Sequence, residues 1–199
     1  MSNIDLKFIE DTYRRKSDED LIAILTQRME GLTPEATAIV KSEIERRGLS
    51  HQFSNAVDAQ QKEYTAAEID AYCAIVQKLP CPITGASDMD LNANMIITVK
   101  SYVFFTQYRP QIVVGSPEAL RKTWNKAMTT TLLAGWWGIP WGIIYTIKGV
   151  GVNLVNKKLS DTSAPTDYLR SFVRTKIGEI EAYKNDPEKL RSIIARRLG

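Results

Sequence analysis

The sequence contains few of the residues that most catalytic and metal sites use. Its 199 residues include one histidine, His51, and two cysteines, Cys73 and Cys81. A single histidine excludes a His-rich metal site, and two cysteines cannot form the disulfide framework of a small secreted domain. His51 stands in the polar stretch SHQFSN and is expected on the surface, whereas Cys73 stands between apolar neighbours and is expected in the core.

An excess of one charge is also missing. The chain has 26 Lys and Arg residues against 23 Asp and Glu residues, with both signs interspersed and a net charge of +3. Nucleic-acid-binding proteins usually present a strongly basic face, so no nucleic-acid partner is expected. The first residues, MSNIDLKFIEDTYRRK, mix acids and bases without an apolar run, so we expect no secretory signal peptide. The expected location is the cytoplasm or a surface that faces it.

Familiar catalytic motifs are absent as well. The sequence has no glycine-rich phosphate loop, no nucleophile elbow and no zinc-protease helix. Asp88 and Asp90 are two neighbouring acids, but a polar turn explains them without any chemistry. We therefore expect no catalytic residue, no cofactor and no small-molecule substrate, and we interpret the protein as a non-enzyme.

Helical periodicity dominates both ends of the chain. In the N-terminal part, residues 1–49, two helix-start signals begin at Ser17 and Thr33, and each precedes apolar residues at helical spacing. Residues 17–48 are therefore predicted to form an αα-hairpin. The polar residues 50–64 are interpreted as a linker, and residues 165–199 are predicted to form C-terminal helices.

The middle of the chain, residues 65–126, predicts a helix followed by a small antiparallel sheet. β-branched and aromatic residues concentrate in 95–99, 102–105 and 112–114, which indicates about three strands. Tyr102, Phe104 and Phe105 could stack on nucleic-acid bases, but a strand core explains them more simply. Together with the flanking helices, this predicts an α+β, mainly helical fold.

Two short motifs flank the predicted sheet and have the outline of zinc knuckles. The motif CPITG begins at Cys81, and the motif SPEA begins at Ser116. In a zinc ribbon, two such turns would supply four thiolates. Here Thr84, Ser116 and Ala119 occupy three of the four ligand positions, so we predict a zinc-ribbon-like sheet without metal. The alternative is that the two motifs are unrelated proline turns.

The most informative segment is Ala127–Ile147, which contains 21 residues and no charge. Gly, Pro and Trp crowd its centre, where a single helix would break, and basic residues flank both of its ends. We therefore predict that residues 127–158 form an apolar helical hairpin that enters a membrane shallowly or contacts a partner protein. The residues expected to make this contact are Leu132, Leu133, Trp136, Trp137, Ile139, Pro140, Trp141, Ile143 and Ile144. A kinked single span, or a hairpin buried within a soluble domain, remains an alternative.

Several stretches resemble an uncharacterised family of bacterial proteins. They are Leu79–Pro82, Leu91–Ala93, Asp167–Val173 and, most specifically, the GWWGIPWG stretch from Gly135 to Gly142. The resemblance extends over roughly residues 65–195. It implies a zinc-ribbon-like module, membrane association and, in members with four cysteines, zinc, but no established reaction. The hairpin at 17–48 also resembles a short appendage found on varied bacterial proteins.

These observations predict a membrane-associated adaptor on the cytoplasmic side of the cell membrane. The hairpin would anchor the protein, and its other parts would bind a protein partner. The alternative is a soluble cytoplasmic interaction module that self-associates, with the Trp-rich segment as its buried core.

Overall fold

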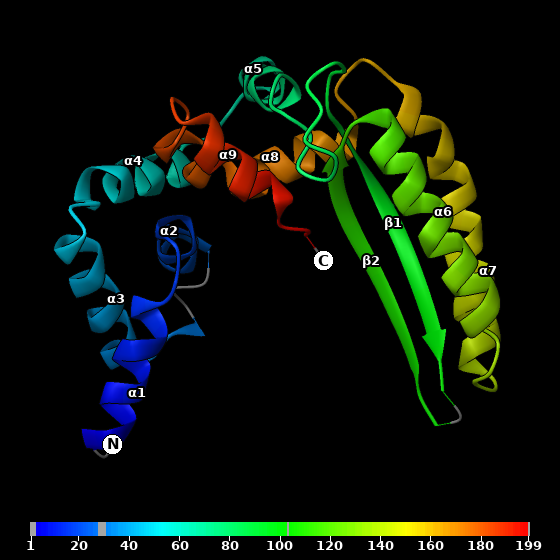
Figure 1. The fold of residues 1–199 in the computed structure, drawn as a ribbon, viewed down its shortest axis with the longest axis horizontal. Coiled ribbons are helices and arrows are strands. Elements are labelled where there is room, and N and C mark those ends of the chain that lie inside the picture. The colour runs from blue at the N-terminus through cyan, green and yellow to red at the C-terminus, as the bar shows by residue number, and fades with distance from the viewer. Residues whose placement is uncertain (1–2, 28–30, 103, 199) are drawn as a thin grey trace. The chain divides into compact units, whose positions relative to one another are not determined.

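The fold is mainly helical with a small antiparallel sheet, as predicted (Figure 1). The computed structural model describes residues 3–27, 31–102 and 104–198. Its helices are α1 (Asn3–Arg14), α2 (Asp18–Gln27), α3 (Pro34–Arg46), α4 (Ser50–Gln61), α5 (Ala66–Gln77), α6 (Pro117–Ala134), α7 (Trp141–Asn156), the 3₁₀ helix η2 (Lys157–Asp161), α8 (Asp167–Ala182) and α9 (Pro187–Ala195). Its strands are β1 (Asn92–Ser101) and β2 (Thr106–Gly115).

The chain divides into two compact units. The N-terminal unit contains Met1–Thr65 and Lys176–Ile193, and the sheet unit contains Ala66–Thr175 and Ile194–Gly199. Each unit has a hydrophobic core of its own. Helix α8 contributes residues to both units because the boundary falls within it.

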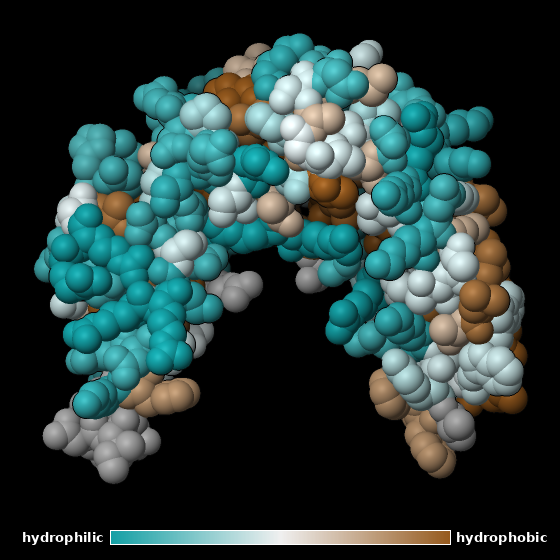
Figure 2. All heavy atoms as spheres, in the orientation of Figure 1, coloured by the Kyte–Doolittle hydropathy of each residue, from teal (hydrophilic) through white to brown (hydrophobic). Residues whose placement is uncertain are grey.

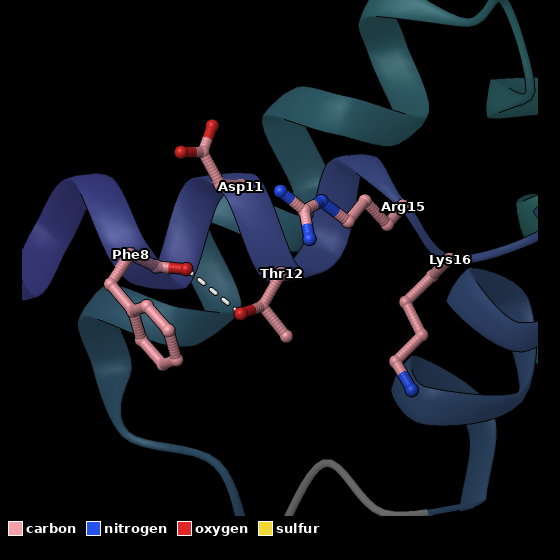
Figure 3. Close-up of a pocket in the computed structure, with 5 residues that line it drawn as sticks. All are labelled: Phe8, Asp11, Thr12, Arg15 and Lys16. Carbon is pink, nitrogen blue, oxygen red and sulfur yellow. Dashed lines mark hydrogen bonds between the residues drawn. The ribbon is translucent and has the colours of Figure 1, made fainter.

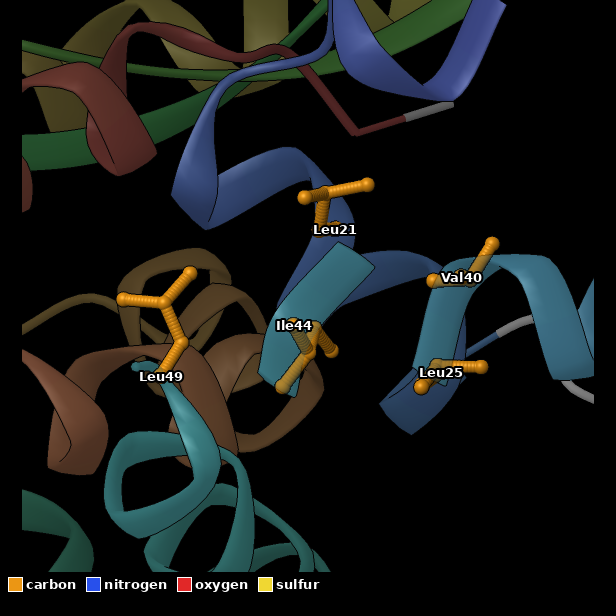
Figure 4. Packing of buried hydrophobic residues seen from close by; sticks show 5 residues of the cluster. All are labelled: Leu21, Leu25, Val40, Ile44 and Leu49. Atoms are coloured by element: carbon orange, nitrogen blue, oxygen red, sulfur yellow. The ribbon is translucent and has the colours of Figure 1, made fainter. Parts of the chain in front are cut away.

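The predicted αα-hairpin is confirmed by α2 and α3. Thr33 begins α3 as predicted, since its hydroxyl accepts a hydrogen bond from the Ala36 N–H at 3.2 Å. The facing apolar residues form the core in Figure 4, which contains Leu21, Leu25, Val40, Ile44 and Leu49. Leu49 follows the hairpin and closes this core from the start of α4.

The predicted linker at 50–64 is wrong, because most of it is helix α4. The only fully buried residues of this helix are small, Ala56 and Ala59, and Phe53 packs half-buried against the core. Its sequence therefore shows no clear apolar stripe. Gly178 of α8 lies against α4: a Cβ on Gly178 would approach the Ala56 carbonyl oxygen to 2.5 Å. Close packing on a glycine therefore stabilises a helix that has no large apolar stripe.

Ion pairs join α2, α3 and α9 within the N-terminal unit. The buried Glu43 carboxylate accepts hydrogen bonds from Arg46 and Arg47, and Arg47 also reaches Asp18 at 2.8 Å. Lys189 of α9 donates to Glu19 at 2.7 Å. Lys189 therefore forms an ion pair within the N-terminal unit.

The sheet unit contains a two-stranded sheet, so the prediction of about three strands is wrong. β1 pairs with β2 in an antiparallel register that sets Met95 opposite Ile112 and Ile97 opposite Pro110. Residues 112–114 are the end of β2 rather than a separate strand. Ile97, the partner of Pro110, directs its N–H and carbonyl groups to Asn153 rather than to β2. This pair therefore makes no ladder hydrogen bond, and the missing N–H of Pro110 leaves the ladder intact.

Asn92, at the start of β1, anchors the polar segment that precedes α8. Its buried side-chain amide donates to the carbonyl oxygens of Thr162 and Ala164, both at 2.8 Å, and accepts from the Thr166 hydroxyl at 2.9 Å. Asn92, which belongs to the Leu91–Ala93 stretch of the family resemblance, therefore has a structural role, since it satisfies loop carbonyls inside the unit.

Candidate membrane-binding surface

Helices α6 and α7 form a hairpin whose chain reverses within residues 135–140, as predicted for this segment (Figure 1). Three glycines allow the close approach that this turn needs. A Cβ on Gly135 would lie 2.1 Å from the Thr146 hydroxyl, and one on Gly142 would lie 2.8 Å from the Gly135 carbonyl oxygen. One on Gly138 would lie 2.7 Å from the Thr106 hydroxyl of β2. The glycines of the GWWGIPWG stretch therefore bring the helices to each other and to the strands.

Polar side chains of the hairpin face inward and bind the free edge of β1. The Asn153 side chain accepts from the Ile97 N–H and donates to the Ile97 carbonyl, both at 2.8 Å. Thr131 accepts from the Val99 N–H at 3.0 Å, and Asn156 donates to the Met95 carbonyl at 3.1 Å. These contacts replace a third strand and satisfy backbone groups that would otherwise need water.

The apolar side chains of the hairpin face outward. All nine residues predicted to contact a membrane or partner are exposed, including Leu133 at 71%, Trp137 at 72% and Ile139 at 83%. Ile147, Leu154 and Val155 extend the same exposed surface along α7. Figure 2 shows hydrophobic surface along α7. We name the exposed apolar residues between Leu132 and Ile147 the hairpin surface. A continuous apolar surface of this kind is typical of interaction sites.

The indole N–H groups of Trp136 and Trp137 find hydrogen-bond partners within the protein. The Trp136 N–H donates to the Leu132 carbonyl at 2.9 Å, and the Trp137 N–H donates to the Leu133 carbonyl at 3.0 Å. These carbonyls belong to the last turn of α6, where helical partners run out. The exposed rings therefore present apolar faces, and their N–H groups are already paired, which suits an apolar solvent.

The aromatic residues between β1 and β2 extend the hairpin surface. Phe104 is 97% exposed, Phe105 is 60% exposed and Tyr102 is 49% exposed, so their assignment to a strand core is wrong. The Tyr102 and Phe105 rings stack with centroids 4.6 Å apart. Gly138 connects the two turns, because a Cβ there would lie 3.3 Å from the Tyr102 carbonyl oxygen. We name Tyr102, Phe104 and Phe105 the strand tip. No glycine or asparagine marks this turn in the sequence, so only its position between two strands could have revealed it.

No family model, curated protein or solved structure matches the chain.

Among the helices in the described part of the chain, none combines the length and the apolar character that crossing a bilayer requires. The hydrophobic residues are instead divided between two helices that lie side by side, so a kinked single span does not describe this segment.

The four positions predicted to be vestigial zinc ligands do come together. The Ser116 N–H donates to the Cys81 sulfur at 3.4 Å, and the Ala119 N–H donates to the Ser116 hydroxyl at 3.4 Å. The Thr84 hydroxyl also hydrogen-bonds to Cys81. Ser116 acts as the N-cap of α6, with Pro117 at the first helical position, so capping accounts for the SPEA motif. Within residues 3–27, 31–102 and 104–198, no cluster of three or more His, Cys, Asp or Glu side chains could hold a metal.

The two cysteines differ in acidity although both are buried. Burial raises the pKa of the Cys81 thiol, but hydrogen bonds from the Thr84 hydroxyl and from the Ser116, Thr84 and Ile83 N–H groups outweigh burial and lower its pKa to about 7. Burial and the Asp70 carboxylate raise the pKa of Cys73 to about 11. Cys73 is therefore a core residue, as predicted, whereas Cys81 lies in a site that stabilises a thiolate.

A hollow of about 390 Å³ lies along α1 (Figure 3). In this view the side chains of Asp11, Arg15 and Lys16 point in different directions, and the Thr12 hydroxyl donates to the Phe8 carbonyl at 2.8 Å. Because no polar groups converge there, the hollow does not qualify as a catalytic or binding site.

Proposed function

We propose that the protein is a non-enzymatic, membrane-associated adaptor that docks on a bilayer through the hairpin surface and the strand tip. The observation that carries the proposal is the continuous exposure of Trp, Ile, Leu and Phe side chains around the turns that end both hairpins. Burial of one such side chain contributes about 1.5–3 kcal/mol, so a few inserted residues suffice for reversible binding. The cytoplasmic face of the cell membrane is the proposed site of work.

The backbone of this end of the molecule supports the same proposal. A bilayer tolerates only segments whose backbone hydrogen bonds are satisfied within the protein. Here the helices are internally bonded, and Asn153 and Thr131 bind the edge of β1. The indole N–H groups of Trp136 and Trp137 are paired with carbonyls. A shallow, end-on insertion therefore requires little desolvation of unpaired polar groups.

The substitution Trp137→Glu tests this function. A carboxylate placed in the apolar region of a bilayer is unfavourable by about 2.5–3.5 kcal/mol, so we expect co-sedimentation with phospholipid vesicles to fall at least about tenfold. Phe8→Glu is the matched control, because Phe8 is 74% exposed and lies in α1 of the N-terminal unit. Equal vesicle binding by the wild type and Trp137→Glu would rule out docking through the hairpin surface.

Self-association is the second candidate, because two copies could cover the same apolar surface. Size-exclusion chromatography with light scattering, in the absence of detergent, separates the two functions. A monodisperse dimer that Trp137→Glu converts into a monomer supports the interaction module. Heterogeneous association that detergent relieves supports the membrane adaptor.

A further inference from the structure

A groove lies beside α6, on the face of the sheet opposite the one that α7 covers. Ile96, Thr98 and Lys100 of β1 form part of its floor, and Lys126 and Thr130 of α6 form part of its wall. Ile97 and Val99, whose side chains alternate with these, contact α7 at Gly149 instead. Arg197 reaches the groove from the C-terminal segment, where Leu198 pairs with Ile112 of β2. The groove has a volume of about 160 Å³.

The charges in this groove all have one sign. Lys100, Lys126 and Arg197 line it, and none of the described lining residues is acidic. Arg109 stands opposite Thr98 in the register and therefore lies on the same face. Arg197 donates to the Gln111 side chain at 3.2 Å, and this partner carries no charge. Three cationic side chains line the groove and a fourth lies on the same face of the sheet, and this arrangement favours binding of an anion.

The groove belongs to a basic segment within a chain of nearly balanced charge. Residues 91–160 contain eight Lys and Arg residues and a single acidic residue, Glu118 at the start of α6. Their net charge is +7, whereas the remaining residues sum to −4. The small net charge of the whole chain therefore conceals a cationic segment, and this segment carries both the hairpin surface and the strand tip.

The depth of the groove matches the headgroup layer of a bilayer. Lys126 lies eight residues before the end of α6 at Ala134, which is about 12 Å along the helix axis. Apolar surfaces of peripheral proteins insert about 5–10 Å into the headgroup and acyl boundary. With the turn inserted to this depth, Lys126 stands at the level of the lipid phosphates.

We propose that this groove binds the phosphate-bearing headgroup of an anionic phospholipid while the hairpin surface and the strand tip insert among the acyl chains. The inference rests on the proposed membrane function and adds to it a headgroup site and a lipid class. Arginine and lysine donate charge-assisted hydrogen bonds to phosphate oxygens, and the surrounding threonines keep the groove polar.

The test compares Lys126→Gln with Lys148→Gln in the full chain. Both lysines are exposed and carry the same charge. Lys148 lies seven residues after Trp141, about 10 Å along α7, but on the face of the sheet that holds Tyr108. The probes are vesicles of phosphatidylcholine alone and vesicles of phosphatidylcholine with phosphatidic acid. The readout is the dissociation constant from co-sedimentation at one fixed ionic strength.

We expect the wild type to bind the anionic vesicles roughly tenfold or more tightly than the zwitterionic ones. Lys126→Gln should weaken binding to the anionic vesicles by roughly tenfold or more, and Lys148→Gln by no more than roughly fivefold. Lys100→Gln should behave like Lys126→Gln. Binding to phosphatidylcholine alone should be the same in all variants, because it depends on the apolar residues.

Five results would overturn the headgroup site. Equal losses in Lys126→Gln and Lys148→Gln would show diffuse attraction, and equal affinity of the wild type for both vesicles would show no lipid selectivity. Saturable binding of inorganic phosphate at micromolar concentration, in the absence of vesicles, would identify a site for free phosphate. Binding of a fluorescent oligonucleotide that Lys126→Gln abolishes would identify a nucleic-acid groove. Binding to neither vesicle would overturn the membrane function as well, so the two failures are distinguishable.

Discussion

At the level of single residues, a buried polar group stabilises this protein when neighbouring side chains pair with it. Glu43 is the clearest case, because only 6% of its side chain is exposed and two arginines hold it. The Arg46 guanidinium, assisted by Arg47 and opposed by burial, lowers the pKa of Glu43 from its ordinary value of 4.5 to about 2. A carboxyl group whose pKa is lower in the folded than in the unfolded protein stabilises the fold in its charged form.

The stability that Glu43 contributes should therefore depend on pH in a defined direction. It is fully present above pH 4.5 and is lost as the pH falls toward 2. We expect Glu43→Gln to lower the free energy of unfolding by about 1–3 kcal/mol at neutral pH and to reduce the loss of stability between pH 4.5 and 2. Urea unfolding of both proteins across this range measures the difference. A wild type and a variant with parallel pH profiles would contradict the assignment.

The surroundings of Cys81 have the arrangement of a zinc knuckle, although three of the four ligand positions lack cysteine. Thr84 and Ser116 donate hydrogen bonds to the Cys81 sulfur, as backbone N–H groups do at a metal-bound thiolate. Ala119 lies close by, since a Cβ on Gly115 would contact both the Ala119 methyl group and the Cys81 sulfur. If this site is a zinc knuckle that has lost three ligands, replacement of Thr84, Ser116 and Ala119 with cysteine should restore binding. We expect the triple variant to bind Co²⁺ with the visible absorption of tetrahedral thiolate coordination.

The wild type and the double variant Thr84→Cys/Ser116→Cys are the controls for this experiment. Neither should show the tetrahedral spectrum, because a closed site needs four ligands. Ser116→Cys removes the N-cap of α6 and should lower stability by about 1 kcal/mol, which thermal unfolding checks separately. A folded triple variant without Co²⁺ affinity would favour two unrelated proline turns that happen to meet.

At the level of whole elements, the sequence predicts what periodicity and caps encode. The helices α2, α3, α5, α8 and α9 and the α6–α7 hairpin were all predictable, because each has a cap or a proline at its start, or a clear apolar stripe. Helix α4 was missed because its fully buried residues are alanines, and Ala56 packs on Gly178, far away in the chain. The prediction of a third strand was wrong for a similar reason, because the groups that cover the edge of β1 come from distant helices. Asn153 and Thr131 bind the edge of β1 from helices, and such pairing is invisible to a pattern of apolar residues.

The candidate surface was predictable to a similar extent. All nine residues predicted from the uncharged segment are exposed. They were predictable because an apolar run without charge that Gly and Pro interrupt is typical of two helices joined by a turn. The strand tip was missed because aromatic residues are equally typical of strand interiors. Its location emerges only when the antiparallel register leaves Tyr102 and Phe105 between Ser101 and Thr106.

At the level of the whole molecule, the hairpin surface and the strand tip should act as one anchor. Both lie at the turn ends of their hairpins within the sheet unit, and Gly138 holds the two turns in contact. If they insert together, polar substitutions in the strand tip should weaken vesicle binding although they lie outside the Trp-rich segment. We expect Phe104→Ser to reduce affinity for phospholipid vesicles by roughly tenfold, which corresponds to about 1.5 kcal/mol of lost apolar burial.

Phe8→Ser is the matched control, since Phe8 is also exposed and lies in the N-terminal unit. Phe8→Ser should leave the affinity for vesicles unchanged.

Combining Phe104→Ser with Trp137→Glu tests the single anchor directly. Contacts made in one insertion event are coupled, so the loss in the double variant should fall short of the sum of the two single losses. Strict additivity would mean that the two tips meet lipid independently. A Phe104→Ser variant that binds like the wild type would remove the strand tip from the anchor and leave the hairpin surface as the whole of it.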